Sequence, residues 1–109
     1  MSKTTTATEF PGEIKVLIDE QKIAERVVDL ASRLEKDLDQ LEGEVTLVPV
    51  MTGSMLFTSD LIRHMQRPVR IAPVTVQSYP GSSARSRGAR LQTPIPDALR
   101  GTHVVIIDD

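Results

Sequence analysis

The chain is 109 residues long, which is the size of one small domain. Lys+Arg number 13 and Asp+Glu number 15, so the formal net charge is -2 and gives no overall attraction for nucleic acid or an anionic membrane. Cysteine is absent, which excludes a disulfide scaffold and a cysteine-ligated metal site. No apolar run is long enough to span a bilayer, and the polar start lacks the apolar core of a secretory signal, so we expect a cytoplasmic protein.

Charge is distributed unevenly along the chain. Residues 1–60 carry 6 basic and 12 acidic side chains, whereas 61–96 carry 6 arginines and no acidic side chain. A stretch of purely positive charge indicates local contact with an anionic ligand. The alternative is a solvated arginine-rich loop, which composition by itself favours.

The first predicted elements are a short strand and an amphipathic helix. The β-branched run Ile14–Ile18 predicts a short edge strand. Asp19 is suited to cap the helix, because its carboxylate can accept from the free N–H groups of the first turn. Apolar residues then recur at intervals of three and four, which places them on one face of a helix ending between Asp37 and Leu41. These residues are Ile23, Val27, Leu30, Ala31, Leu34 and Leu38.

The middle of the chain predicts strand, helix and strand. The apolar run Val45–Val50 is typical of a strand, and this strand should end near Pro49 because proline has no N–H for a ladder. Met55–Met65 predicts a second helix. Val69–Gln77 predicts the next main strand, with Pro73 as a local flaw.

The last third contains a loop and a final strand. Ser78–Thr93 lacks apolar periodicity and is rich in serine and arginine, which predicts a long mobile loop. Pro94–Arg100 predicts a turn or brief helix, and His103–Ile107 is typical of a strand buried on both faces. The order of elements predicts an α/β fold with a mostly parallel sheet flanked by helices. We expect residues 1–12 to be a disordered lead-in and 13–109 to form the folded portion.

Two predicted strand ends carry polar residues, and ligands of parallel α/β sheets gather at such ends. Thr52, Gly53 and Ser54 lie between a strand and a helix, where free N–H groups favour an anion such as phosphate, although a plain turn shows the same pattern. Asp108 and Asp109 can bind a divalent metal or accept from sugar hydroxyls. An acidic pair also occurs in receiver domains, but there it lies near the beginning of the chain.

The polar segment 78–88 is a candidate lid, because its hydroxyls and arginines can fold over a phosphate and exclude water. Tyr79 can cover a ligand or simply anchor the loop. We interpret His64 and His103 as structural, since neither has a Cys, Glu or second His at ligand spacing.

Taken in order, these pieces resemble the hypoxanthine–guanine phosphoribosyltransferase family, over roughly residues 13–109. The resemblance implies an incomplete type I phosphoribosyltransferase-like α/β fold. The matching stretches are Glu13–Glu20 for the entry strand and first helix, Leu47–Ser54 for the pyrophosphate loop, Asp60–Arg63 for the helix that follows, Ser78–Ser83 for the head of the lid, and Val104–Asp109 for the first half of the phosphoribosyl pyrophosphate signature.

The resemblance implies a purine-salvage enzyme. Such enzymes transfer ribose 5-phosphate from phosphoribosyl pyrophosphate to hypoxanthine or guanine with Mg²⁺, release pyrophosphate, and form dimers or tetramers. The resemblance also implies a cis peptide between Thr52 and Gly53. It assigns pyrophosphate binding to Thr52 and Gly53, the lid to Ser78 and Tyr79, and the ribose and Mg²⁺ to Asp108 and Asp109.

The sequence departs from the family pattern in three respects. The family usually has lysine at Thr52 and glycine at Pro49. Its general base, an aspartate three positions after the acidic pair, and its purine-recognising lysine and aromatic residue would follow Asp109. We therefore expect the chain to stop inside the signature motif and to be inactive by itself. The alternatives are a non-catalytic module that binds phosphoribosyl pyrophosphate or regulates in response to it, and a receiver-like domain.

Overall fold

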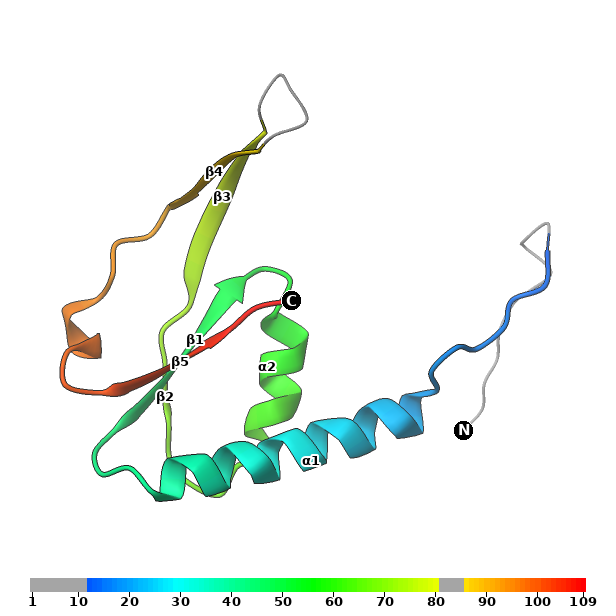
Figure 1. Ribbon diagram of the computed structural model, residues 1–109, viewed down its shortest axis with the longest axis horizontal. Helices are drawn as coiled ribbons and strands as arrows, with labels where there is room; N and C mark the ends of the chain where they lie inside the picture. The colour runs from blue at the N-terminus through cyan, green and yellow to red at the C-terminus, as the bar shows by residue number, and fades with distance from the viewer. Residues whose placement is uncertain (1–11, 81–85) are drawn as a thin grey trace.

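The computed structural model describes residues 12–80 and 86–109 (Figure 1). From residue 20 onward its elements follow the predicted order, with an additional strand at Ser86–Leu91. Most of the predicted lead-in, 1–12, lies outside the described residues. The elements are α1 (Glu20–Asp39), β1 (Val45–Met51), α2 (Met55–Ile62), β2 (Arg70–Ile71), β3 (Val74–Pro80), β4 (Ser86–Leu91), the 3₁₀ turn η2 (Asp97–Leu99) and β5 (His103–Ile107).

Strand β1 is the centre of a five-stranded sheet. It pairs in parallel with β5 along one edge and with β2 and β3 along the other. Strand β4 is the exception, because it pairs with β3 in antiparallel fashion. The predicted α/β fold with a mostly parallel sheet is therefore confirmed.

A shared break in the sheet explains how β1 accommodates a proline. Leu47 pairs with Ile71, and Val50 pairs with Val74 at the same offset in sequence, so β2 and β3 are one interrupted strand. Within that register Pro49 stands opposite Pro73, and neither residue has an N–H to donate. The prediction that β1 ends near Pro49 is confirmed, because the strand ends at Met51. Pairing with β2 and β3 lapses between Leu47 and Val50, whereas on the other side Pro49 still pairs with Ile107 of β5.

Both helices pack on one face of the sheet. Successive strand residues point to opposite faces, so alternate residues of β1 and β5 meet the helices. Asp19 caps α1 as expected, since its Oδ1 accepts from the N–H of Lys22 at 2.8 Å. No helix in the described ranges is long and apolar enough to cross a membrane. The buried core cluster consists of Ala31, Leu38, Val45, Leu47, Leu61 and Ile107.

The start of the described chain differs from the prediction. Residues Ile14–Ile18 are exposed and form no strand. On the predicted apolar face of α1, Val27, Ala31 and Leu38 are buried and Leu34 is half-buried. Ile23 is 54% exposed and Leu30 is 43% exposed. The exposure of Ile23 follows from the course of α1, because the N-terminal half of this helix extends past the sheet (Figure 1).

Strand β5 is not buried on both faces. Ile107 faces the helices and is buried, whereas Val104 is 44% exposed and Ile106 is 70% exposed. The uniformly apolar sequence of this strand predicts burial on both faces. In the described part of the chain, however, β5 lies at an edge of the sheet and only one of its faces meets the helices.

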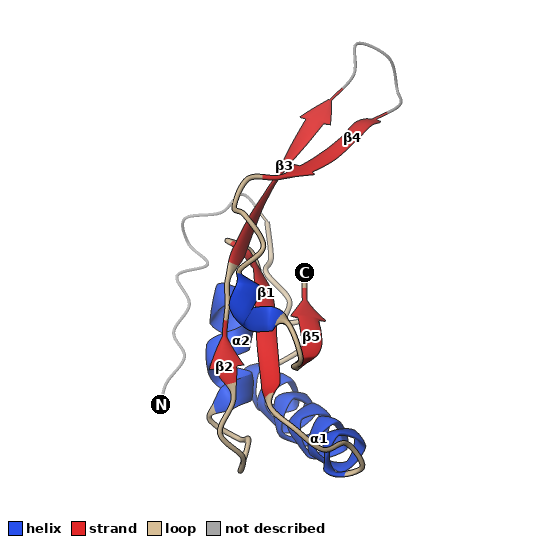
Figure 2. Ribbon diagram, turned by 90° about the vertical axis from the view of Figure 1, so that its left-hand side faces the viewer, coloured by secondary structure: helices blue, strands red, loops and turns tan. Residues whose placement is uncertain are grey.

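Segment Ser78–Thr93 is not simply a loop. β3 extends to Pro80 and β4 begins at Ser86, and the two pair as the arms of a hairpin whose tip, 81–85, is outside the described residues (Figure 2). Backbone ladders, with Val76 opposite Leu91, hold these arms. Apolar periodicity did not reveal them, because backbone hydrogen bonds do not depend on side-chain type.

The two predicted structural histidines differ in surroundings. His64 lies exposed just beyond α2. His103 is the first residue of β5. Its ring Nε2 lies 2.7 Å from the carbonyl oxygen of Glu42, and its backbone N–H donates to the backbone carbonyl of Glu44 at 2.8 Å. His103 therefore fastens the start of β5 to the turn before β1.

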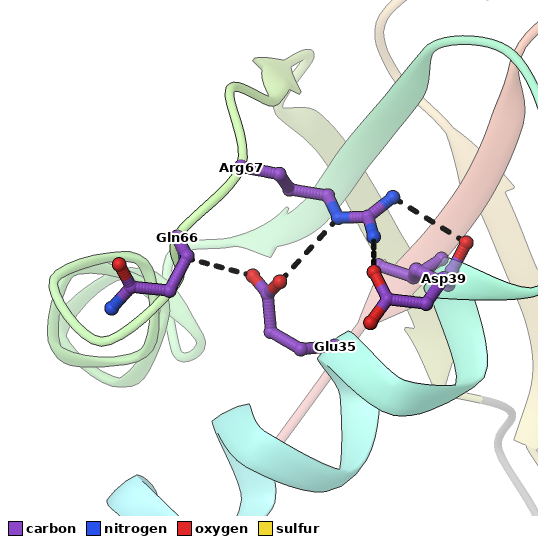
Figure 3. Close-up of polar contacts among 5 residues, drawn as sticks. Glu35, Asp39, Gln66 and Arg67 are labelled. Atoms are coloured by element: carbon purple, nitrogen blue, oxygen red, sulfur yellow. Dashed lines mark hydrogen bonds and ion pairs between the residues drawn. The ribbon is translucent and has the colours of Figure 1, made fainter.

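Arg67 ties the end of α1 to the segment that leads into β2 (Figure 3). Its Nε is buried and lies 3.5 Å from Glu35 Oε2, and its other nitrogens contact Asp39 and the carbonyl of Leu38. The second oxygen of Glu35 accepts from the N–H of Gln66 at 2.9 Å. Since the side chains of Arg67 and Glu35 are only 21% and 16% exposed, this ion pair is far less screened than a surface pair.

Replacing Arg67 with glutamine should lower the free energy of unfolding by about 1–3 kcal/mol, because Glu35 is left as a half-buried charge without its partner. The matched control is Arg63→Gln, which removes an exposed pair with Asp60 and should cost under about 0.5 kcal/mol. Urea denaturation measures both. Equal effects of the two substitutions would contradict the importance of the Arg67 contacts.

Candidate functional site

A buried serine anchors the loop that follows β1. Ser54 is buried, and its hydroxyl donates to the carbonyl of Val50 at 2.8 Å. Thr58, one turn further along α2, donates its own hydroxyl to the carbonyl of Ser54 at 2.7 Å. These two bonds join the end of the strand, the loop and the first turn of the helix into one unit.

The loop and the first turn of α2 also carry backbone amide groups without a hydrogen-bond partner among the described residues. The N–H groups of Thr52, Gly53, Leu56 and Phe57 make no hydrogen bond to another described residue. Ser54 directs its hydroxyl backward to the strand, so it does not cap the helix. Free N–H groups at the start of a helix, together with the helix dipole, form a site suited to an anion.

A cis peptide bond lies in this loop, between Met51 and Thr52. The prediction of a cis bond between Thr52 and Gly53 is therefore wrong by one position. The resemblance identified the loop, but not the bond within it.

Asp109 lies directly against Gly53. A Cβ atom added to Gly53 would stand 2.8 Å from the carboxylate carbon of Asp109 and closer still to one of its oxygens. The sheet explains this meeting, because Pro49 pairs with Ile107 and both strands then end at the same edge. Gly53 has no positive φ, so glycine is required here by the close approach of a side chain and not by backbone conformation.

The acidic pair is exposed beside the loop. The N–H of Asp109 donates to Asp108 Oδ1 at 2.9 Å, which fixes the two residues relative to each other. Within the described residues no group of three His, Cys, Asp or Glu side chains is positioned to hold a metal ion. Two carboxylates nevertheless suit Mg²⁺, which is commonly bound through one or two carboxylates together with water and phosphate oxygens.

The predicted lid residues lie on a different element. Ser78 and Tyr79 belong to β3, which continues beyond the end of β1 into the hairpin arm (Figure 2). Thr75 pairs with Met51, so at the usual rise per residue the backbone of Ser78 lies about 10 Å further along the strand. The structure thus brings Thr52, Gly53, Asp108 and Asp109 together, whereas Ser78 and Tyr79 lie on the arm that projects past them.

Sequence reasoning missed three features of this site. The anchoring by Ser54 had a signal, since serine at a helix start commonly makes local hydrogen bonds. The free amides of Leu56 and Phe57 follow from the start of α2 once its position is known. The contact between Gly53 and Asp109 had no local signal, because it joins residues 56 positions apart through the pairing of β1 with β5.

No family model matches the sequence. The chain is 29% identical, over 95% of its length, to the hypoxanthine-guanine phosphoribosyltransferase of Mycobacterium tuberculosis, and covers 54% of that protein. One similar solved structure is a hypoxanthine-guanine phosphoribosyltransferase from Bacillus anthracis, with 32% identity and a TM-score of 0.71, covering 89% of this chain and 54% of that one. Another is a hypoxanthine phosphoribosyltransferase from Trypanosoma cruzi, with 30% identity and a TM-score of 0.70, covering 89% of this chain and 53% of that one. The predicted resemblance and fold class are confirmed, and the chain spans about half the length of the curated relatives it matches.

The Ser54 anchor can be tested by replacing it with alanine. Ser54→Ala leaves the site without its buried hydroxyl bond and should cost about 1–2 kcal/mol of unfolding free energy. Ser59→Ala is the matched control, because Ser59 makes the same kind of bond, to the carbonyl of Met55, on an exposed face. Its cost should stay within about 0.5 kcal/mol in the same thermal or urea denaturation. A cost for Ser54→Ala no larger than that of the control would contradict the anchoring role.

Proposed function

We propose, on the premise of this similarity to hypoxanthine–guanine phosphoribosyltransferases, that the chain forms the pyrophosphate and ribose side of such an active site. The reaction is the transfer of ribose 5-phosphate from phosphoribosyl pyrophosphate to hypoxanthine or guanine in purine salvage. The observation that carries the proposal is the contact of Asp109 with Gly53. It joins an amide-lined loop, suited to an anion, to a pair of carboxylates at one edge of the sheet.

In this proposal the loop receives the leaving pyrophosphate. The unpaired amides of Thr52 and Gly53, with the start of α2 behind them, would donate to its oxygens as negative charge develops. Thr52 supplies no positive charge where the family usually has lysine. Binding would therefore depend on the backbone donors and on the helix dipole.

Asp108 and Asp109 would accept hydrogen bonds from the ribose hydroxyls and hold Mg²⁺ in the same proposal. The metal, when bound, supplies positive charge that stabilises the pyrophosphate leaving group. The geometry favours this division, because both carboxylates are exposed at the strand end that borders the loop.

The remaining roles belong to the same proposal. Ser78 and Tyr79 would serve the lid from the hairpin arm. The partners would be phosphoribosyl pyrophosphate and a purine base, the assembly a dimer or tetramer, and the working location the cytoplasm.

Calorimetry with phosphoribosyl pyrophosphate and Mg²⁺ tests the proposal on the 109-residue chain. We expect binding, and Gly53→Ala should weaken it about tenfold, because the added methyl group occupies the space of the Asp109 carboxylate. Gly12→Ala is the control, since a Cβ there meets nothing within 4 Å. Absence of binding by the unmodified chain would refute the proposed function.

A turnover assay complements the binding experiment. Adding hypoxanthine to the mixture should release no pyrophosphate above background, because the purine-recognising and proton-transferring residues of the family pattern are not among these 109. Robust release of pyrophosphate would contradict this expectation, because it would show that these 109 residues suffice for the transfer reaction.

A further inference from the structure

An apolar groove of about 540 Å³ lies along one flank of α1. Its floor is formed by Ile23, Val27 and Leu30, which recur at intervals of four and three and so share one helical stripe. Phe57 of α2 and Ile18, from the segment before α1, complete the apolar lining. Because Ile18, Ile23 and Leu30 are 60%, 54% and 43% exposed, the groove presents apolar surface to solvent.

The rim of this groove is basic. Lys22, Arg26 and Arg33 line it at intervals of four and seven, which places them in one row along the helix beside the apolar stripe. Arg26 pairs with Asp29 at 3.4 Å, and Asp29 also lines the groove. None of the ion pairs among the described residues involves Lys22 or Arg33. The groove therefore has an excess of positive charge.

The shape of the groove suits a helix better than an extended peptide. Its long wall is the interior of α1, whose backbone groups are already hydrogen-bonded, so an extended peptide would find no free sheet edge to join. Apolar side chains of a second helix, spaced by three or four residues, can follow the stripe from Ile23 to Leu30. Lys22 and Arg33 lie roughly 17 Å apart along the axis at the usual helical rise, which is the length of three turns.

The charge of the rim decides which occupant is favoured. A second copy docked through the same surface would bring two groups of cations together, because a two-fold interface uses the same patch on both molecules. An anionic membrane would meet the rest of α1 as well, and this helix carries 6 acidic and 4 basic side chains. A single acidic helix meets only the groove, where the charge is positive.

We propose that this groove binds an acidic amphipathic helix of a partner protein. The apolar stripe of the partner packs on Ile23, Leu30 and Phe57, and its carboxylates pair with Lys22 and Arg33. Arginine fixes the orientation of the partner, since a guanidinium can donate to a carboxylate through two parallel N–H groups. No side chain of the groove belongs to the loop after β1 or to the acidic pair, so this partner is additional to the ligands proposed above.

Fluorescence anisotropy of the 109-residue chain with labelled synthetic peptides tests the proposal. The probe is a helix of about 18 residues, or five turns, with leucine on one face and glutamate on the other. Its counterpart carries lysine in place of every glutamate. We expect the glutamate peptide to bind at least about tenfold more tightly at low ionic strength, and added salt should shrink the difference.

The basic rim is tested by charge reversal. Arg33→Glu should weaken binding of the glutamate peptide about tenfold and strengthen binding of the lysine peptide, because one charge of the rim changes sign. Lys36→Glu is the matched control. It makes the same change at an exposed position of α1 outside the groove, and it should alter either Kd by less than about twofold.

The apolar floor is tested by truncation. Ile23→Ala should weaken binding of the glutamate peptide about threefold to tenfold, because less apolar surface is buried on docking. Val28→Ala is the control, since Val28 is a similarly exposed apolar residue of α1 that does not line the groove. Circular dichroism of each variant verifies that the fold is retained.

Three results would overturn the proposal. Equal affinity for the two peptides, or equal effects of Arg33→Glu and Lys36→Glu, would show that the rim does not select an acidic partner. Self-association in sedimentation velocity that Ile23→Ala abolishes would identify a second copy as the occupant. Binding to phosphatidylserine vesicles that Arg33→Glu abolishes, without binding to the glutamate peptide, would identify a membrane.

Discussion

Strand β5 pairs in parallel with β1 along its whole length, from His103 opposite Val45 to Ile107 opposite Pro49. Two parallel strands in register deliver whatever follows them to the same edge of the sheet. Here the first is followed by a helix-starting loop with free amides, and the second by two aspartates. The contact between Gly53 and Asp109, which brings the loop and the acidic pair together, depends on this ladder.

The ladder in turn depends on how β1 is supported. One face of the strand packs on both helices through an aliphatic core, and its second neighbour is the interrupted strand formed by β2 and β3. Arg67 and Glu35 hold α1 against the segment that enters β2. The pairing of β1 with β2 and β3 lapses between Leu47 and Val50, where Pro49 has no N–H to donate.

The site combines two kinds of electrostatic group at one edge of the sheet. Amide dipoles at the start of α2 attract anions, and the carboxylates after β5 attract cations and hydroxyl donors. A phosphorylated sugar with a divalent metal offers both kinds of partner at once. The chemistry of the site and the similarity to phosphoribosyltransferases therefore point in the same direction, although they rest on different observations.

The sequence by itself determined the order of the elements from α1 to β3, the final strand β5, the capping of α1 by Asp19, the place of the loop around Gly53 and the acidic pair at the end of β5. These are local properties, set by residue type and short-range spacing. Only the tertiary structure decided that Ile106 is exposed, that β3 and β4 pair as a hairpin and that Asp109 lies against Gly53. Burial, strand pairing and contact all depend on residues distant in sequence, and periodicity along one segment carries no information about what packs against it.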